Sequence, residues 1–225
     1  MPVGRTRSLD GVDEIEYIVI DDGSTDRTSS IAQQQGVDEV ICLNRHLGLA
    51  TAFSAGIQTA LRRGADILVN TDADLQYPSR YIGELITPLL RGEADIAIGD
   101  RLSQKPAPFS FLKMALQRMG SLFVRLFSGI RTVRDAASGF RAFNRDPMEA
   151  MVIHISFSYT LESITLAGMK KLRIANVPIT INKTDRKSRL FNSIPEYVTR
   201  SIISVVRAYL MYKTLKFYSW IGFLF

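Results

Sequence analysis

Residues 66–78 have the sequence DILVNTDADLQYP, and this stretch decides the fold class. Asp66–Thr71 is a short apolar run that predicts a buried strand, and Pro78 suits the first turn of a helix. Asp72 and Asp74 follow the strand directly. Two carboxylates one residue apart at a strand end can bind one hard cation such as Mg²⁺, and Gln76 offers a further oxygen ligand.

The same alternation of strand and helix extends outward over the first hundred residues. Strands are predicted at Glu16–Asp21, Asp38–Leu43, Asp66–Thr71 and Ala94–Gly99, and helices from Ser24 or Thr25 to Gly36, at Gly48–Arg63 and at Pro78–Arg91. This order predicts an α/β fold with a mainly parallel sheet flanked by helices on both faces. Ligands of such sheets bind at the carboxyl ends of the strands. The polar residues at these predicted ends are Asp21, Asp22, Asp72, Asp74 and Arg101.

Charge divides the chain into an acidic and a basic part. Residues 1–100 carry 8 Lys and Arg against 16 Asp and Glu, a net charge of −8, and residues 101–225 carry 20 against 6, a net charge of +14. The basic part predicts an anionic partner. The single cysteine, Cys42, excludes an intramolecular disulfide and a multi-cysteine metal site, and its apolar neighbours predict that it is buried.

The second half is less regular. A strand or extended loop is predicted at Ser138–Asn144, and two further elements are a helix at Tyr159–Met169 and a strand at Leu172–Ile181. Asn182–Asn192 is a basic loop. Two amphipathic, basic helices, Phe109–Phe127 and one that runs from the capping box Ser193–Glu196 to Lys213, predict contact with a membrane surface. We therefore expect a catalytic domain at residues 1–192, and an interfacial helix with the start of a hydrophobic membrane segment at residues 193–225.

Five motifs in register carry a family resemblance. They are IVIDDGSTDRT (18–28), NRHLGLATAFSAG (44–56), NTDADLQYP (70–78), IAIGDR (96–101) and DAASGFRAFNRD (135–146). Together they resemble the family-2 inverting glycosyltransferases, which have the GT-A fold. Within that family, DADLQ, SGFRAF and a basic loop before a terminal hydrophobic region are similar to the polyprenyl-phosphate sugar transferases, such as the dolichol-phosphate mannose synthases and the bacterial undecaprenyl-phosphate enzymes.

The resemblance implies a role for each matching position. Catalytic roles would fall to Asp74, Arg101 and Arg141, the two arginines neutralising phosphates. Mg²⁺ or Mn²⁺ would be bound by Asp72, Asp74 and Gln76. Substrate-binding residues would be Asp21, Asp22, Gly23, Asp72, Ser138, Lys187 and Arg189, of which the last two belong to the basic loop. The implied partners are a nucleotide-sugar donor, a polyprenyl phosphate acceptor and a membrane surface on the cytoplasmic face, without nucleic acid.

The prediction of the acceptor rests on a motif that the chain lacks. Processive polysaccharide synthases of the family carry Gln-x-x-Arg-Trp, whereas the one tryptophan here is Trp220, outside any such motif. A lipid phosphate is already ionised and attacks without a general base, which a hydroxyl acceptor would need. Transfer to a saccharide hydroxyl, with Glu162 or Asp135 as the base, stays open, as does an inactive membrane-bound fragment or partner subunit. His46 and His154 lack partners for catalysis and are interpreted as structural.

The amino-terminal residues depart from the family pattern. Family members begin with a strand and turn resembling Ile-Pro-Ala-Tyr-Asn-Glu, and nothing in Met1–Glu14 matches it. That strand lies inside the sheet in the family. We therefore expect a sheet that lacks an interior strand, in a chain that is truncated at both ends.

Overall fold

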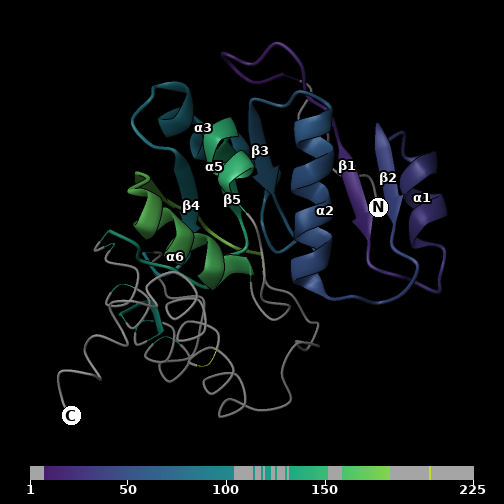
Figure 1. The fold of residues 1–225 in the computed structure, drawn as a ribbon. Coiled ribbons are helices and arrows are strands. Elements are labelled where there is room, and N and C mark those ends of the chain that lie inside the picture. The colour runs from purple at the N-terminus through teal and green to yellow at the C-terminus, as the bar shows by residue number, and fades with distance from the viewer. Residues whose placement is uncertain are drawn as a thin grey trace.

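The computed structural model describes residues 8–103, 132–151 and 159–182, and residues 114, 118, 120–122, 125, 130 and 203. In the first part, strands alternate with helices as the sequence predicts (Figure 1). The elements, in chain order, are β1 (Ile18–Asp21), α1 (Thr28–Gln34), β2 (Glu39–Cys42), α2 (Leu49–Arg62), β3 (Ile67–Asn70), the 3₁₀ turn η1 (Ser79–Tyr81), α3 (Ile82–Leu90) and β4 (Ile96–Asp100).

The second part adds two strands and two helices to this framework. They are β5 (Arg141–Asn144), α5 (Arg145–Ala150), α6 (Tyr159–Lys170) and β6 (Ile174–Pro178), so the predicted helix and both predicted strands of this region are confirmed. The two helices predicted to contact a membrane lie almost wholly outside the described residues. Among the residues that are described, no helix is both long and apolar enough to cross a membrane.

A mixed four-stranded sheet forms the centre of the molecule. Its strand order is β3-β5-β4-β6, and β5 runs antiparallel to both of its neighbours, whereas β4 and β6 are parallel. The sequence predicted a mainly parallel sheet, and this needs a correction. The segment SGFRAFN forms β5 and separates β3 from β4, with Arg141 opposite both Asn70 and Ile98.

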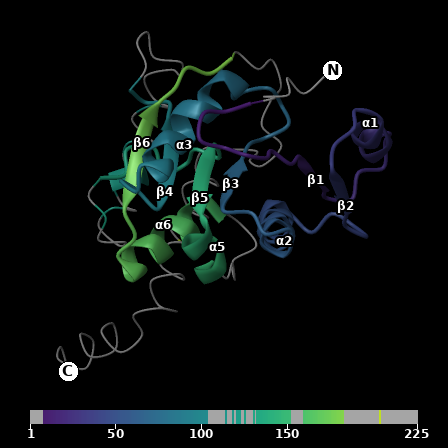
Figure 2. The same cartoon turned by 90° about the horizontal axis from the view of Figure 1, so that it is seen from above.

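A second, smaller sheet contains only β1 and β2, which are parallel. Both views place β1 next to β3 in the order β2, β1, β3, β5, β4 (Figures 1 and 2). Since β1 pairs with β2 and β3 pairs with β5, the remaining edges of β1 and β3 face each other, and no described strand joins them. We call these two edges the open seam. The sequence predicted a sheet that lacks an interior strand, without a position for the gap, and this stays a prediction.

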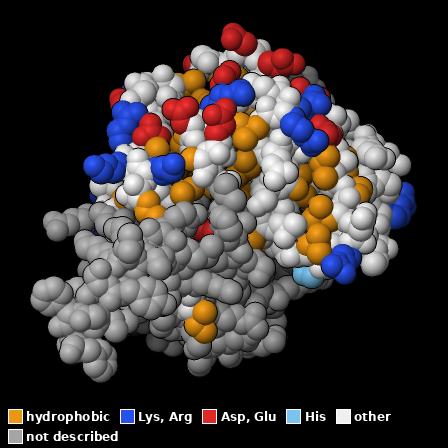
Figure 3. All heavy atoms as spheres, in the orientation of Figure 1, with side chains coloured by type: hydrophobic (Ala, Val, Ile, Leu, Met, Phe, Trp, Pro, Cys, Tyr) orange, Lys and Arg blue, Asp and Glu red, His pale blue; other side chains and the backbone are white. Residues whose placement is uncertain are grey.

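The residues that border the open seam are unusually exposed for central strands. All four residues of β3 and three of the four in β1 are only half-buried, whereas all five residues of β4 are buried. Hydrophobic side chains also reach the surface over α2 and on both sides of it (Figure 3). The core therefore lies in the four-stranded sheet.

Two hydrophobic clusters cover the two faces of the four-stranded sheet. Because successive strand residues point to opposite faces, Ile96 and Ile98 join one cluster and Ala97 joins the other. The first cluster contains residues of α2, α5 and α6, and the second contains the apolar face of α3. Helices on both faces were predicted, and here this holds for the larger sheet.

Two local predictions were wrong. Helix α1 begins at Thr28, later than the predicted caps Ser24 and Thr25, because the Asp26 carboxylate accepts the Thr28 backbone N–H at 2.9 Å. Cys42 is exposed at the end of β2, which pairs with β1 alone among the described strands, and its thiol lies 3.3 Å from Ser29 Oγ.

Candidate functional site

The end of β3 brings Asp72 against the loop that precedes β5. A Cβ atom on Gly139 would lie 3.1 Å from Asp72 Oδ2 and 3.1 Å from the Tyr159 hydroxyl, so a side chain here would press on this carboxylate. Asn70 fixes the same loop, since its side-chain amide donates to the Gly139 carbonyl and to the Tyr159 hydroxyl, both at 2.8 Å. The strand end, the loop and the start of α6 therefore form one support under Asp72.

The Asp72 carboxylate is partly removed from water without receiving a hydrogen bond from any described residue. Burial raises the pKa of Asp72, the neighbouring charge of Asp74 raises it further, and Arg101 partly offsets both effects. A nearby cation stabilises the ionised form of a carboxylate that burial and a second negative charge have destabilised. The environment of Asp72 thus suits a metal ligand.

The turn after Asp72 presents a second carboxylate to solvent. Asp74 is exposed, and its Oδ1 accepts the backbone N–H of Gln76 at 2.9 Å. Between them, Leu75 has a φ of +59°, in the left-handed region that side chains other than glycine rarely adopt. The backbone of Gln76 accepts a hydrogen bond from Asn182 at 2.9 Å. The predicted ligands Asp72, Asp74 and Gln76 therefore lie on one constrained turn.

A divalent cation fits this donor set. Among the described residues, no group of three or more His, Cys, Asp or Glu side chains is placed to bind a metal. Mg²⁺ is often bound by one or two carboxylates together with phosphate oxygens and waters, so Asp72 and Asp74 are sufficient when a diphosphate supplies the remaining ligands.

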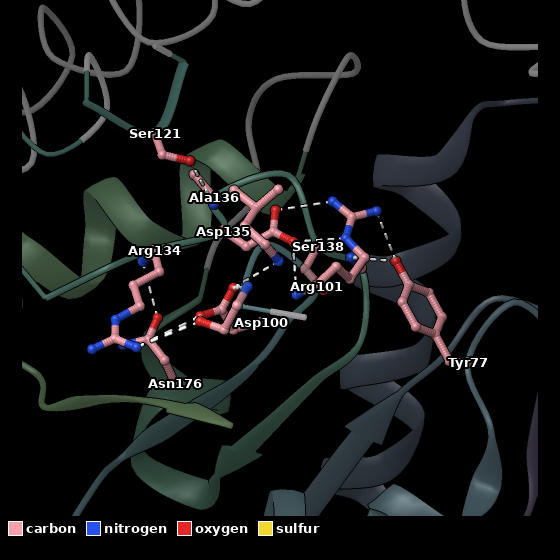
Figure 4. A network of polar contacts seen from close by, with 12 residues as sticks. Tyr77, Asp100, Arg101, Ser121, Arg134, Asp135, Ala136, Ser138 and Asn176 are labelled. Carbon is pink, nitrogen blue, oxygen red and sulfur yellow. Dashed lines mark hydrogen bonds and ion pairs between the residues drawn. The ribbon is translucent and has the colours of Figure 1, made fainter. Parts of the chain in front are cut away.

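Arg101 lies at the end of β4 and points toward the same region. Figure 4 shows it between Asp135 and Tyr77. Its Nε and Nη2 donate to the two Asp135 carboxylate oxygens at 2.7 and 2.9 Å, and Nη1 lies 3.4 Å from the Tyr77 hydroxyl, which also accepts the Gly139 N–H at 3.3 Å. Arg101 and Asp135 are both buried. The network therefore connects Arg101 to the loop that supports Asp72.

Arg141, on β5, is completely buried and braces that loop from inside. Its guanidinium donates to the backbone carbonyls of Ala136, Ser138 and Thr160, each at 2.8 Å, and to Ser163 Oγ at 2.6 Å. Burial lowers the pKa of Arg141 to about 10, which still leaves the side chain charged at neutral pH. The predicted contact with a phosphate would require Arg141 to leave these partners.

Ser138 contributes a polar group that the described residues do not satisfy. The residue is fully buried, and its Oγ has no hydrogen-bond partner in the described part of the chain. Figure 4 places Ser138 beside Arg101 and Asp135. A buried hydroxyl without a partner is costly, and the binding role predicted for Ser138 stays a prediction.

The aspartates at the end of β1 organise the two turns that follow. Asp21 is buried, accepts the Ser24 N–H at 2.9 Å and contacts the Ser29 hydroxyl. Asp22 accepts the backbone N–H groups of Leu47 and Gly48 at 2.7 and 2.9 Å. If Asp22 binds the nucleotide, as the family resemblance implies, its carboxylate would accept hydrogen bonds from the nucleotide in addition to those from Leu47 and Gly48.

Gly23 allows a close approach of the chain to itself. A Cβ there would lie 2.4 Å from the carbonyl carbon of Arg45, and its φ is +76°. His46 Nδ1 lies 2.8 Å from Asp22 Oδ2, and the His46 side chain is largely exposed. Lys187, Arg189 and His154 lie outside the described residues.

Sequence reasoning missed several supporting residues. Asn70, Tyr77 and Tyr159 all contact the loop that contains Gly139, from sequence separations of 62 residues at Tyr77, 69 at Asn70 and 20 at Tyr159. A signal was available for Asn70, because asparagine is disfavoured in strands yet follows the apolar run Ile67–Val69.

Comparison with known proteins identifies the family of this arrangement. Residues 7–152 match the model of glycosyl transferase family 2. The chain is 27% identical over 218 residues to an undecaprenyl-phosphate mannosyltransferase of Micrococcus luteus, covering 92% of this chain and 87% of that one. It is also 27% identical over 185 residues to a UDP-N-acetylglucosamine–dolichyl-phosphate N-acetylglucosaminyltransferase of Methanococcus voltae, covering 72% of each chain.

A solved structure confirms the fold class. The glucosyl-3-phosphoglycerate synthase of Mycobacterium tuberculosis, crystallised with Mn²⁺, UDP and glucosyl-3-phosphoglycerate, superposes with a TM-score of 0.64 at 19% identity, covering 87% of this chain and 68% of that one. This likeness supports the GT-A-like α/β fold of the chain.

Proposed function

The chain belongs to glycosyl transferase family 2, and on that premise we propose that it transfers a sugar from a nucleotide diphosphate to a polyprenyl phosphate, with inversion. Two relatives named above differ in the sugar they transfer but share a polyprenyl phosphate acceptor. That shared acceptor supports the class of acceptor proposed here and leaves the sugar undetermined.

Asp72 and Asp74 would hold Mg²⁺ or Mn²⁺ against the diphosphate of the donor. The metal, when bound, supplies Lewis-acid stabilisation of the negative charge on the leaving nucleoside diphosphate. Binding of Mn²⁺ and UDP by the structural neighbour supports this arrangement. Arg101, at the neighbouring strand end, adds positive charge to the site, although Asp135 balances part of it.

The ion pair between Asp135 and Arg101 is the observation that favours a lipid phosphate over a hydroxyl as the acceptor. Transfer to a hydroxyl needs a base that can take a proton. Asp135 is completely buried and both of its carboxylate oxygens accept from Arg101, so neither oxygen is turned toward an acceptor hydroxyl. Glu162, the other candidate base, is 2% exposed. An ionised lipid phosphate needs neither of them, because its oxygen attacks the anomeric carbon directly.

A membrane-surface location on the cytoplasmic side is part of the proposal. It rests on the basic second half, with a net charge of +14, and on the polyprenyl acceptors of the relatives. Lys187 and Arg189 would contact the phosphates of donor or acceptor from the basic loop.

The test is release of nucleoside diphosphate from a panel of nucleotide sugars, with Mn²⁺ and one acceptor at a time. The proposal expects release to rise when vesicles contain undecaprenyl or dolichyl phosphate and to stay at the hydrolytic background with neutral saccharides. Release that depends on a saccharide instead would favour the hydroxyl acceptor and a base role for Glu162 or Asp135.

A further inference from the structure

We propose that Asn182 is a positioning residue that sets the conformation of the metal-binding turn. This inference rests on the proposed function of Asp72 and Asp74. Asn182 is 107 positions away from Leu75 in sequence, yet it makes two hydrogen bonds to this turn. Its side-chain amide donates to the Leu75 carbonyl at 2.8 Å, and its backbone N–H donates to the Gln76 carbonyl at 2.9 Å.

The conformation that Asn182 holds is one that the turn does not favour by itself. Leu75 has a φ of +59° and is 50% exposed, so burial of its side chain does little to hold this backbone conformation. A left-handed leucine persists only where surrounding contacts determine it. The bond from Asn182 to the Leu75 carbonyl is such a contact, because it fixes the peptide that follows the strained residue.

The strained residue in turn orients the metal ligand before it. Gln76 N donates to Asp74 Oδ1 at 2.9 Å, a bond that spans Leu75 and depends on its backbone angles. If Leu75 relaxed to a common conformation, the Gln76 N–H would turn away and Asp74 would lose its fixed orientation. Asn182 therefore acts on Asp74 through Leu75.

The segment that carries Asn182 is itself firmly placed. After β6, Ile179 N donates to the Asp100 carbonyl at 3.1 Å, and Thr180 Oγ1 contacts the Tyr81 hydroxyl at 2.6 Å and Arg80 at 2.9 Å. These contacts hold residues 179–182 alongside the chain from Gln76 to Tyr81. Asn182 is thus a fixed support against which the turn can be held.

The experiment titrates the full chain with Mn²⁺, alone and with UDP, and follows free Mn²⁺ by its electron paramagnetic resonance signal. Removing a group that orients a metal ligand weakens metal affinity by roughly 10- to 100-fold. We therefore expect Asn182→Ala to raise the Mn²⁺ dissociation constant roughly 10-fold. Asp74→Ala removes the proposed ligand itself, so its Mn²⁺ affinity serves as the reference for a site that has lost this ligand.

Two further variants separate positioning from general damage. Asn176→Ala removes an asparagine on β6 that donates to the Thr132 carbonyl at 2.8 Å and accepts the Arg134 N–H at 3.0 Å. Neither partner belongs to the metal-binding turn, so this variant should leave Mn²⁺ affinity unchanged. Leu75→Gly removes the strain, because glycine adopts positive φ readily. In the Leu75→Gly variant, the further change Asn182→Ala should weaken Mn²⁺ binding by less than about 3-fold. The smaller effect is expected because Asn182 acts on the metal site through Leu75, so the two substitutions are not additive.

The outcomes distinguish this inference from the proposed function. If the wild type binds Mn²⁺ and Asp74→Ala does not, yet Asn182→Ala binds like the wild type, the positioning role is wrong and the metal site stands. Equal losses in Asn182→Ala and Asn176→Ala would also overturn it, since both would then report general destabilisation. Mn²⁺ binding that is insensitive to Asp74→Ala would overturn the metal site and this inference together.

Discussion

At the scale of single residues, the Asp72 carboxylate is less stable ionised in the fold than in water. Burial and Asp74 raise its pKa above the ordinary 3.8, so ionising this carboxyl costs more free energy in the fold than in the unfolded chain. The stabilisation from this group is complete below pH 3.8 and is lost as the pH rises through the raised value. At neutral pH the ionised Asp72 therefore destabilises the fold, and a bound cation would remove this destabilisation.

This cost predicts the behaviour of Asp72→Asn. Without divalent metal at pH 7, the variant should be at least as stable as the wild type, whereas with Mn²⁺ the wild type should be the more stable protein. Urea denaturation between pH 3 and pH 8, with and without Mn²⁺, measures both differences. A variant that is less stable than the wild type by more than about 1 kcal/mol without metal would show that Asp72 is held by contacts instead.

Asp74 gives the complementary prediction. Asp74 is exposed, and its hydrogen bond to the Gln76 N–H is local, so Asp74→Ala should cost less than about 1 kcal/mol of stability and reduce metal-dependent transfer by at least about 100-fold. Matched thermal melts and transfer assays test the two parts. Undiminished transfer in the variant, or full wild-type activity in excess chelator, would remove the metal from the account.

The proposed metal ligands could be predicted from sequence, but the contacts that support them could not. Asp72 and Asp74 stand one residue apart after an apolar run, and this local pattern is sufficient to propose them. The roles of Gly139, Tyr159 and Asn182 depend on contacts between segments that only the tertiary fold brings together. The inward direction of Arg141 was also unreadable, because a buried and an exposed arginine have the same sequence signature.

At the scale of elements, the turn after β1 requires a glycine at position 23, and this requirement can be tested. Gly23→Ala would force a Cβ to within 2.4 Å of the Arg45 backbone at a positive φ and should cost about 2–5 kcal/mol. Gly64→Ala is the control, because its φ is +83° but no atom lies within 4 Å, so only the backbone penalty of about 1–2 kcal/mol applies. Equal losses in the two variants would contradict the close approach of the two loops.

The order of elements was predictable, whereas the pairing of β5 was not. Apolar runs, glycines and Pro78 mark the first four strands and their helices, and these appear where expected. The segment SGFRAFN was predicted as a strand or extended loop, but its insertion between β3 and β4 depends on which edges remain open after those strands fold. Local sequence patterns do not contain that information.

At the scale of the whole molecule, the open seam predicts uneven protection of the backbone. Amides of β4, which has a neighbour on each side, should exchange slowly with deuterium, whereas those on the free edges of β1 and β3 should exchange much faster. Hydrogen exchange read out by mass spectrometry or NMR resolves the three strands. Uniform protection across β1, β3 and β4 would mean that the seam is closed in solution.

The seam also bears on stability as a whole. The half-buried residues of β1 and β3 would become buried beneath a further strand, and burial of apolar surface stabilises a fold. A variant extended upstream by a strand and helix of the family type should therefore melt more cooperatively and bind nucleotide sugar more tightly than the 225-residue chain. Identical melts and affinities for the two forms would show that the seam needs no further strand.

The identity of the product tests the central claim most directly. The chain, or its upstream-extended form, is incubated with Mn²⁺, radiolabelled nucleotide sugar and vesicles that contain polyprenyl phosphate, and the label is partitioned between organic solvent and water. We expect the label to enter the organic phase as an acid-labile lipid-linked sugar phosphate, and Asp74→Ala to abolish this transfer. Label found only in water-soluble glycan, under conditions in which the wild type is active, would contradict it.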